Sequence, residues 1–249
     1  MNSYWSLERF GRIQLSKSFF VRDFLHSEIG AFHGIRNVPV DPDLMIYTGR
    51  KLCEAILEPL SETFGRIHIR SGYRSPTLNQ FGHERGLNCA SNRNSAAEHL
   101  WDLRDAGGHA GACASVVIPW FLNQRRPEDW PQLARWMHDH LEYDRLTFFA
   151  YQTAFNVSWR ENPRREIRSY IAPLGRLNGK GAEGWSEHPI EHEGFPPFRG
   201  ALTPLDEIPW KPSKGLQPVA PMRPVARAIV NSSQTLLPLD MGTDYRGRR

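Results

Sequence analysis

The sequence predicts an α+β domain with a small antiparallel sheet and flanking helices, followed by a long, irregular, proline-rich arm. Three observations support this fold class: segments of alternating polar and apolar residues, helical segments with one apolar side, and a change of texture after residue 171. A period of two residues is typical of half-buried strands, and a period of 3.6 of helices. We expect the domain to span residues 1–171 and the arm residues 172–249.

Two helices are expected before the first strand. Residues 15–30 predict a short amphipathic helix, with Ser16 or Ser18 as its N-cap. The letters DPD open a second helix over residues 41–65, because acidic side chains favour the positive end of the helix dipole and proline fits the first turn. Pro59 is expected to kink or end that helix.

The sheet is expected from five segments and is joined by one further helix. The strand patterns are RIHIR, ASVVIPWF, RLTFFAY, AFNVSWR and EIRSYI, at residues 66–70, 114–121, 145–151, 154–160 and 166–171. The helix is EDWPQLARWMHDHLEY, at residues 128–143. SGYRSPTLN, after the first strand, is rich in turn residues. Residues 172–249 hold more than half of the 19 prolines, so we expect them to be disordered or to lie over another surface.

Composition narrows the class of protein. Hydrophobic residues make up 40% of the chain and the net charge is +4, which is ordinary for a globular domain with a mild preference for anionic partners. No segment interleaves basic clusters with stacking aromatics, so we expect no nucleic-acid partner. No apolar run is long enough for a membrane span or a secretion signal, so we expect synthesis in the cytosol. Three cysteines are too few for a disulfide framework.

The segment IRSGYRSPTLN resembles the zinc peptidases that cut peptidoglycan stem peptides. These are the D-Ala-D-Ala carboxypeptidases and L-Ala-D-Glu endopeptidases, whose fold is shared with the Hedgehog signalling domain. Supporting matches are LSKSFFVRDFLHSE, LCEAILEPLSETFGRIHI, VVIPWF, YDRL and FNVSWRENPRRE, so the resemblance covers roughly residues 15–171. It implies the Hedgehog-like fold, with peptidoglycan or another cell-surface polymer as the partner.

The resemblance also implies a substrate site. Arg74 takes the position of the family arginine that pairs with a substrate carboxylate, and Ser71, Tyr73 and Asn156 are expected beside it as substrate-binding residues. The alternative is that Ser71, Gly72 and Arg74 only shape and brace a turn.

The zinc ligands that the family supplies are incomplete in this sequence. The family pattern is S-x-H-x-x-G-x-A-x-D, with a later histidine in a W-H-V-S-like strand. Anchoring on His99 places Ala106 at the aspartate position, whereas anchoring on VVIP places Ser115 there and Gly108 at the histidine. Asn156 takes the place of the later histidine, and no glutamate precedes it to serve as general base.

Two hypotheses follow from these residues. The first is a degenerate peptidase-like domain without a cofactor, which binds a surface polymer or forms part of a phage-like particle and contacts neighbouring subunits through its arm. The second is an active zinc hydrolase with a rearranged ligand set, for which Glu98 is the only nearby candidate base. The candidate metal ligands are His99, Asp102, Asp105 and His109.

Overall fold

The computed structural model describes residues 3–149, 154–178 and 192–200, which build a mixed α/β domain. The helical elements, in chain order, are α1 (Tyr4–Gly11), η1 (Val21–Phe24), α2 (Glu28–His33), α3 (Pro42–Leu52), η2 (Cys53–Leu57), α4 (Glu58–Phe64), α5 (Pro76–Glu84), α6 (Asn92–Ser95), α7 (Pro119–Gln124), η3 (Pro127–Asp129) and α8 (Trp130–His140). The strands are β1 (His68–Ser71), β2 (Gly111–Val117), β3 (Arg145–Phe148), β4 (Phe155–Arg160), β5 (Glu166–Ser169) and β6 (Gly175–Arg176). No helix of the described residues is long and apolar enough to cross a membrane.

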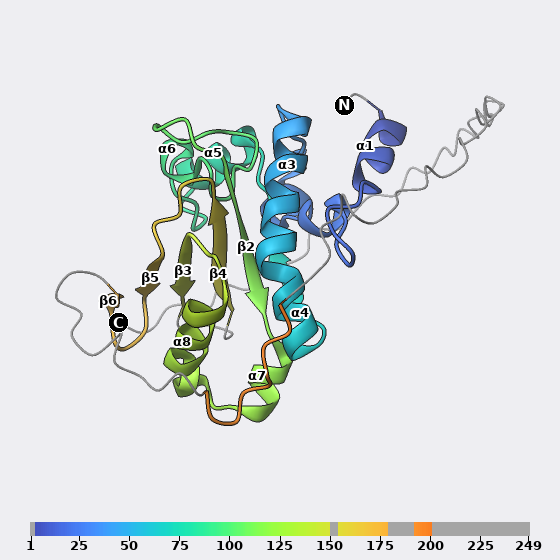
Figure 1. Cartoon of the computed structure of the whole chain (residues 1–249). Coiled ribbons are helices and arrows are strands. Elements are labelled where there is room, and N and C mark those ends of the chain that lie inside the picture. The colour runs from blue at the N-terminus through green and yellow to red at the C-terminus, as the bar shows by residue number, and fades with distance from the viewer. Residues whose placement is uncertain (1–2, 150–153, 179–191, 201–249) are drawn as a thin grey trace, which may run out of the picture. The chain divides into compact units, whose positions relative to one another are not determined.

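The six strands form one open sheet in the order β1-β2-β4-β3-β5-β6 (Figure 1). All neighbours pair antiparallel except β3 and β5, which run parallel. The expected wholly antiparallel sheet is therefore wrong at this one pair. β4 lies between β2 and β3, so both of its edges are filled and β5 pairs with the free edge of β3 instead. The sheet also continues past residue 171 through β6.

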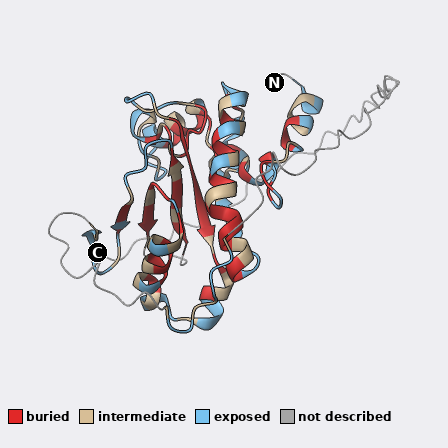
Figure 2. Cartoon of the chain, in the orientation of Figure 1, coloured by how far each residue is buried: buried red, intermediate tan, exposed pale blue. Residues whose placement is uncertain are grey.

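One face of the sheet carries the hydrophobic core. Ala112, Ala114 and Val116 of β2 point to this face, as does Val157 of β4. α3 contacts β2 and β4, and the same core includes buried residues of α4 and α8 (Figure 2). Successive side chains of a strand alternate between faces, so the intervening residues of these strands must point to the opposite face.

The second predicted helix is present and continues beyond Pro59. A π-helical turn, η2, precedes the proline, and the amide of Glu58 donates to the carbonyl of Cys53, five residues earlier. This wide turn separates the proline ring from the carbonyl that it would meet in an ideal α-helix, so the helix continues to Phe64. It ends at Gly65, whose φ of 79° is in the region that favours glycine.

The predicted helix over residues 15–30 is wrong. The chain instead forms a tight turn before η1, in which the amide of Leu15 donates to the carbonyl of Phe19. Neither candidate capping serine caps a helix. The hydroxyls of Ser16 and Ser18 donate to the buried carboxylate of Glu58, at 2.7 and 2.9 Å. These long-range bonds hold the turn against α4 and outweigh the local helical pattern.

The segment SGYRSPTLN begins a helix rather than forming turns alone. Ser75 is the N-cap of α5 and Pro76 is its first residue. The buried amide of Asn79 then donates to Asn92 and to the carbonyl of Ala90, which holds α6 beside α5. A serine followed by a proline, here Ser75 and Pro76, is a common start of a helix, so the sequence contained this signal.

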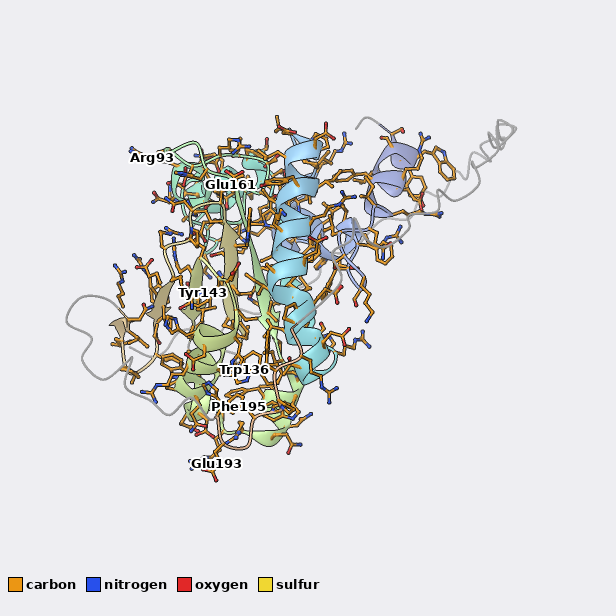
Figure 3. All side chains as sticks on the ribbon, viewed as in Figure 1. Arg93, Trp136, Tyr143, Glu161, Glu193 and Phe195 are labelled. Atoms are coloured by element: carbon orange, nitrogen blue, oxygen red, sulfur yellow. The ribbon has the colours of Figure 1, made fainter. Side chains whose placement is uncertain are left out.

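Most of the predicted arm lies outside the described residues, but residues 192–200, which we call the strap, are described. The Phe195 ring lies 5.5 Å from that of Trp120 and 6.2 Å from that of Phe64, and the amide of Arg199 donates to Thr63. Figure 3 labels Phe195 at the end of the domain formed by α7 and α8. The strap therefore packs on the domain itself.

Candidate functional site

The second face of the sheet is polar. Register places Ser71, Ser115, Asn156, Thr147 and Arg168 side by side across β1, β2, β4, β3 and β5. Because cross-strand partners point to the same face, these five side chains form one row. Such a row of hydroxyl, amide and guanidinium groups can offer hydrogen bonds to a polar ligand.

His99 lies over this face in the loop between α6 and β2. Its Nδ1 is 2.9 Å from the carbonyl oxygen of Gly72, and its Nε2 is 3.3 Å from the amide nitrogen of Asn156 and 3.9 Å from the Sγ of Cys113. A carbonyl oxygen only accepts, so Nδ1 must carry the proton and Nε2 must accept from Asn156. The imidazole is thereby fixed in one orientation and one tautomer.

His99 is held neutral. Burial is the main cause, and the positive charge of Arg74 adds to it; together they lower the pKa of the imidazole to about 3. A neutral ring with an unprotonated Nε2 is also the form that would bind a metal ion.

Arg74 lies beside His99. A backbone hydrogen bond joins the two residues, and the positive charge of Arg74 acts on the imidazole. Its amide donates to the carbonyl of His99 at 2.8 Å, and its Nη1 lies 2.8 Å from the Sγ of Cys89. The Nε atom is buried and has no hydrogen-bond partner among the described residues. An unused buried donor costs free energy, so a ligand acceptor at this atom would be favoured. Arg74 through its backbone amide and Asn156 through its side-chain amide thus both contact His99.

Tyr73 does not face a ligand. Its side chain is fully buried and its hydroxyl donates to Oδ2 of Asp102 at 2.8 Å. The amide of Val40 donates to the same oxygen, and burial raises the pKa of Asp102. The expected role of Tyr73 in substrate binding is therefore wrong for this geometry: the pair braces the core under the SGYR turn. Ser71 is half-buried on the polar row.

His99 and Asp102 do not share a helix face. Residues 97–105 form consecutive turns, and Ala97 has a φ of 54°, which interrupts any helix. His99 consequently points to the sheet, whereas Asp102 points to Tyr73.

Glu98, the candidate base, is bound by three guanidinium groups. Its Oε1 accepts from Arg145 at 2.6 Å, from Arg164 at 2.7 Å and from Arg160 at 3.2 Å. A carboxylate enclosed in this way is part of an ion-pair network and is poorly placed to accept a proton from water.

Asp105 and His109 belong to the rim of the same network. Asp105 pairs with Arg160 at 2.5 Å and accepts from the amide of His109 at 2.9 Å. The His109 ring lies 3.4 Å from the carboxylate. The hydrogen bonds and the guanidinium charge outweigh the effect of desolvation and hold the pKa of Asp105 below its ordinary value.

A catalytic zinc does not fit the groups that surround the Nε2 of His99. The Cys113 thiol is buried, which raises its pKa well above the ordinary value, so the thiolate that binds zinc is costly to form there. The Asn156 amide donates to the nitrogen that would have to bind the metal. Of the four candidate ligands only His99 reaches this point, and no group of three His, Cys, Asp or Glu side chains in the described ranges is placed to hold a metal ion.

Cys113 and Cys89 lie beside the candidate site, although isolated cysteines in a sequence are more often core packing. Cys113 lies two residues before Ser115 on β2 and therefore points to the same polar face. The alternation of that strand was a usable signal, because it excludes Ala112 and Ala114 from the site. The contact between Cys89 and Arg74 had no such signal, since it depends on the loop after α5.

No family model, curated protein or solved structure matches this chain. The function must therefore be argued from the geometry around His99.

Proposed function

We propose that the chain is a catalytically degenerate peptidoglycan-peptidase-like domain with the Hedgehog-type fold, which binds a carboxylate of a cell-surface polymer and does not cut it. The observation that carries the proposal is the hydrogen bond from Asn156 to Nε2 of His99. This bond uses the lone pair that a zinc ion would need. The engagement of Glu98 by three arginines supports the same conclusion, because no other carboxylate was a candidate base.

Arg74 is the proposed ligand anchor. A guanidinium pairs with a carboxylate through two parallel hydrogen bonds, and Arg74 has a buried Nε without a partner in the described structure. Asn156 on the polar row, which is half-buried, would then contact a polar group that flanks the carboxylate.

A second part of the proposal concerns assembly. We place the chain on a phage-like particle that is made in the cytosol, with the region after residue 172 contacting neighbouring subunits. More than half of the 19 prolines fall in this region, and a restricted backbone loses little entropy when it docks. The residues that would make these contacts lie mostly outside the described ranges.

Co-sedimentation of the full chain with purified peptidoglycan sacculi tests the binding proposal. We expect saturable binding that weakens about tenfold in Arg74→Gln, the loss that corresponds to one charge-assisted hydrogen-bonded pair. Arg93→Gln is the matched control, because Arg93 is an exposed arginine on α6 that is not part of the polar row and is remote from β5 and β6 (Figure 3). Equal binding by the wild type and both variants would refute the role of Arg74.

A further inference from the structure

Three arginines, from β3, β5 and β6, surround one buried glutamate near the β6 edge of the sheet. The Glu166 side chain is only 5% exposed. Its carboxylate lies 2.8 Å from Nε of Arg168, 3.4 Å from Nε of Arg145 and 3.7 Å from Nε of Arg176. One negative charge therefore faces three positive charges, and all three guanidiniums approach it through the Nε atom.

The outer two arginines present their remaining donors to solvent. Arg168 and Arg176 are cross-strand partners on β5 and β6, and their side chains are 50% and 55% exposed. Because both turn Nε toward Glu166, their Nη groups are left without an acceptor among the described residues. Arg145 differs, since its Nη2 donates to Glu98. The exposed pair consequently forms a clamp with several unused donors.

Like charges directly opposite one another on a sheet are destabilising. The single negative charge of Glu166 offsets only part of the repulsion between Arg168 and Arg176, because Glu166 also forms an ion pair with Arg145. An external anion bound between Arg168 and Arg176 would neutralise the remaining repulsion. The arginine clamp thus has both the free donors and the electrostatic reason to bind an anion.

We propose that Arg168 and Arg176, oriented by Glu166, form a binding site for a phosphate group. A carboxylate has two oxygens, which a single guanidinium can saturate in bidentate fashion. A phosphate has enough acceptor oxygens to engage both guanidiniums together. The site would take either free phosphate or a phosphate carried by a polymer.

The clamp lies on the same sheet face as the proposed carboxylate anchor. Arg168 is in the polar row, two strands from Asn156, which corresponds to about 10 Å at the usual strand spacing. A polymer with phosphates and carboxylates could contact both places. This polymer-borne case rests on the proposed function, whereas binding of free phosphate does not.

Calorimetric titration of the full chain tests the clamp, with inorganic phosphate and poly(glycerol phosphate) as separate probes. We expect Arg168→Gln to weaken binding of both probes about tenfold and Arg93→Gln to change it less than twofold. Tighter binding of the polymer than of free phosphate identifies a polymer-borne source, and equal affinity per phosphate identifies free phosphate. Equal weakening in both variants, or equally tight binding of acetate, would overturn the phosphate site.

Glu166→Gln separates a built clamp from a diffuse basic patch. The substitution makes the chain more positive, so a diffuse patch would bind phosphate more tightly. A clamp that Glu166 orients would bind it more weakly, which is our expectation. Thermal unfolding of the variant checks its fold. If it does not fold, Arg176→Lys makes the same distinction, because it keeps the charge that a diffuse patch needs and removes the planar fork that a clamp needs.

The two proposals fail in different ways. Arg74→Gln is expected to weaken binding to sacculi and to leave inorganic phosphate binding unchanged. Failure of the wild-type chain to bind sacculi, with its phosphate binding intact, would therefore refute only the proposed function. Phosphate binding that is insensitive to Arg168 and Arg176 would refute only the clamp.

Discussion

At the scale of single residues, one amide decides the chemistry of the site. Asn156 donates to the Nε2 of His99, and the Cys113 thiol lies 3.9 Å from the same nitrogen. A histidine at position 156 and a carboxylate at position 113 would, together with His99, supply three metal ligands. The imidazole is already neutral and correctly oriented by Gly72, so only the partners are lacking.

The residue-scale prediction is therefore a two-step gain of metal binding. Asn156→His alone should leave the chain with well below one zinc per molecule, because burial makes the Cys113 thiolate, the form that binds zinc, costly to form. Combined with Cys113→Asp it should bring zinc content close to one per chain, measured by metal analysis after dialysis. Neither variant should hydrolyse stem peptides, since Glu98, the candidate base, is engaged by three arginines.

The single variant is the control for the double one, and thermal unfolding should show that both are folded. Stoichiometric zinc in Asn156→His alone, or none in the folded double variant, would contradict the placement of Cys113.

At the scale of elements, the ion-pair network fastens the loop that carries His99 to the sheet. Asp144 is fully buried at the start of β3 and pairs with Arg160 of β4 and with Arg164. Burial alone would raise its pKa, but the hydrogen bonds and charge of Arg164 and the charge of Arg160 hold it below the ordinary value of 3.8. Arg160 and Arg164 then reach Glu98, next to His99.

The network predicts loss of stability in acid. A carboxyl with a lower pKa in the folded state binds fewer protons there, so its contribution is complete above about pH 5 and falls as pH drops below its unfolded value. His99 acts in the same direction at higher pH, because its pKa of about 3 lies below the ordinary 6.5. Denaturant unfolding between pH 7 and pH 3 should show both losses.

Asp144→Asn should lower the free energy of unfolding at neutral pH by about 3–5 kcal/mol, because it leaves buried guanidiniums without their partner. The variant should also lose less of its free energy of unfolding than the wild type as the pH falls below 4. Glu62→Gln, which removes only the exposed pair with Lys17, is the control and should change little. An unchanged acid limb in Asp144→Asn would show that the network does not govern it.

Elements with a clear local pattern could be predicted, and those fixed by long-range bonds could not. Alternation identified β1, β3, β4 and β5 within a few residues, and apolar spacing identified α8. The turn before η1 depends on Glu58, some 40 residues away, and the parallel pairing of β5 depends on which strand edges are filled. Within the site, Arg74, His99 and Asn156 were identified because a motif or an alignment marked them. The arginine clamp and the network around Glu98 were missed, since their partners meet only in the fold.

At the scale of the whole domain, the strap closes the end of the core near α4 and α8. Phe195 packs against Phe64 and Trp120, and the Arg125 guanidinium lies 4.9 Å from its ring centroid. The Phe195 ring therefore covers apolar surface of Phe64 and Trp120 at this end of the core.

Phe195→Ala should therefore lower the free energy of unfolding by about 2 kcal/mol, less than for a fully buried ring because Phe195 is only half-buried. Phe32→Ala is the control, since that ring is 85% exposed and its loss should cost under about 0.5 kcal/mol. Chemical denaturation of both variants measures the difference. Equal stability of the two would mean that the strap does not contribute to the domain.

The central claim is that the site around His99 binds but does not cut. It is tested most directly by measuring the amino groups that the wild-type chain releases from peptidoglycan sacculi in the presence of added zinc. We predict saturable binding with no release above a protein-free control, because Asn156 engages Nε2 of His99 and Glu98 is engaged by arginines. Zinc-dependent release that is lost on chelation would contradict this account and establish a hydrolase with a rearranged ligand set.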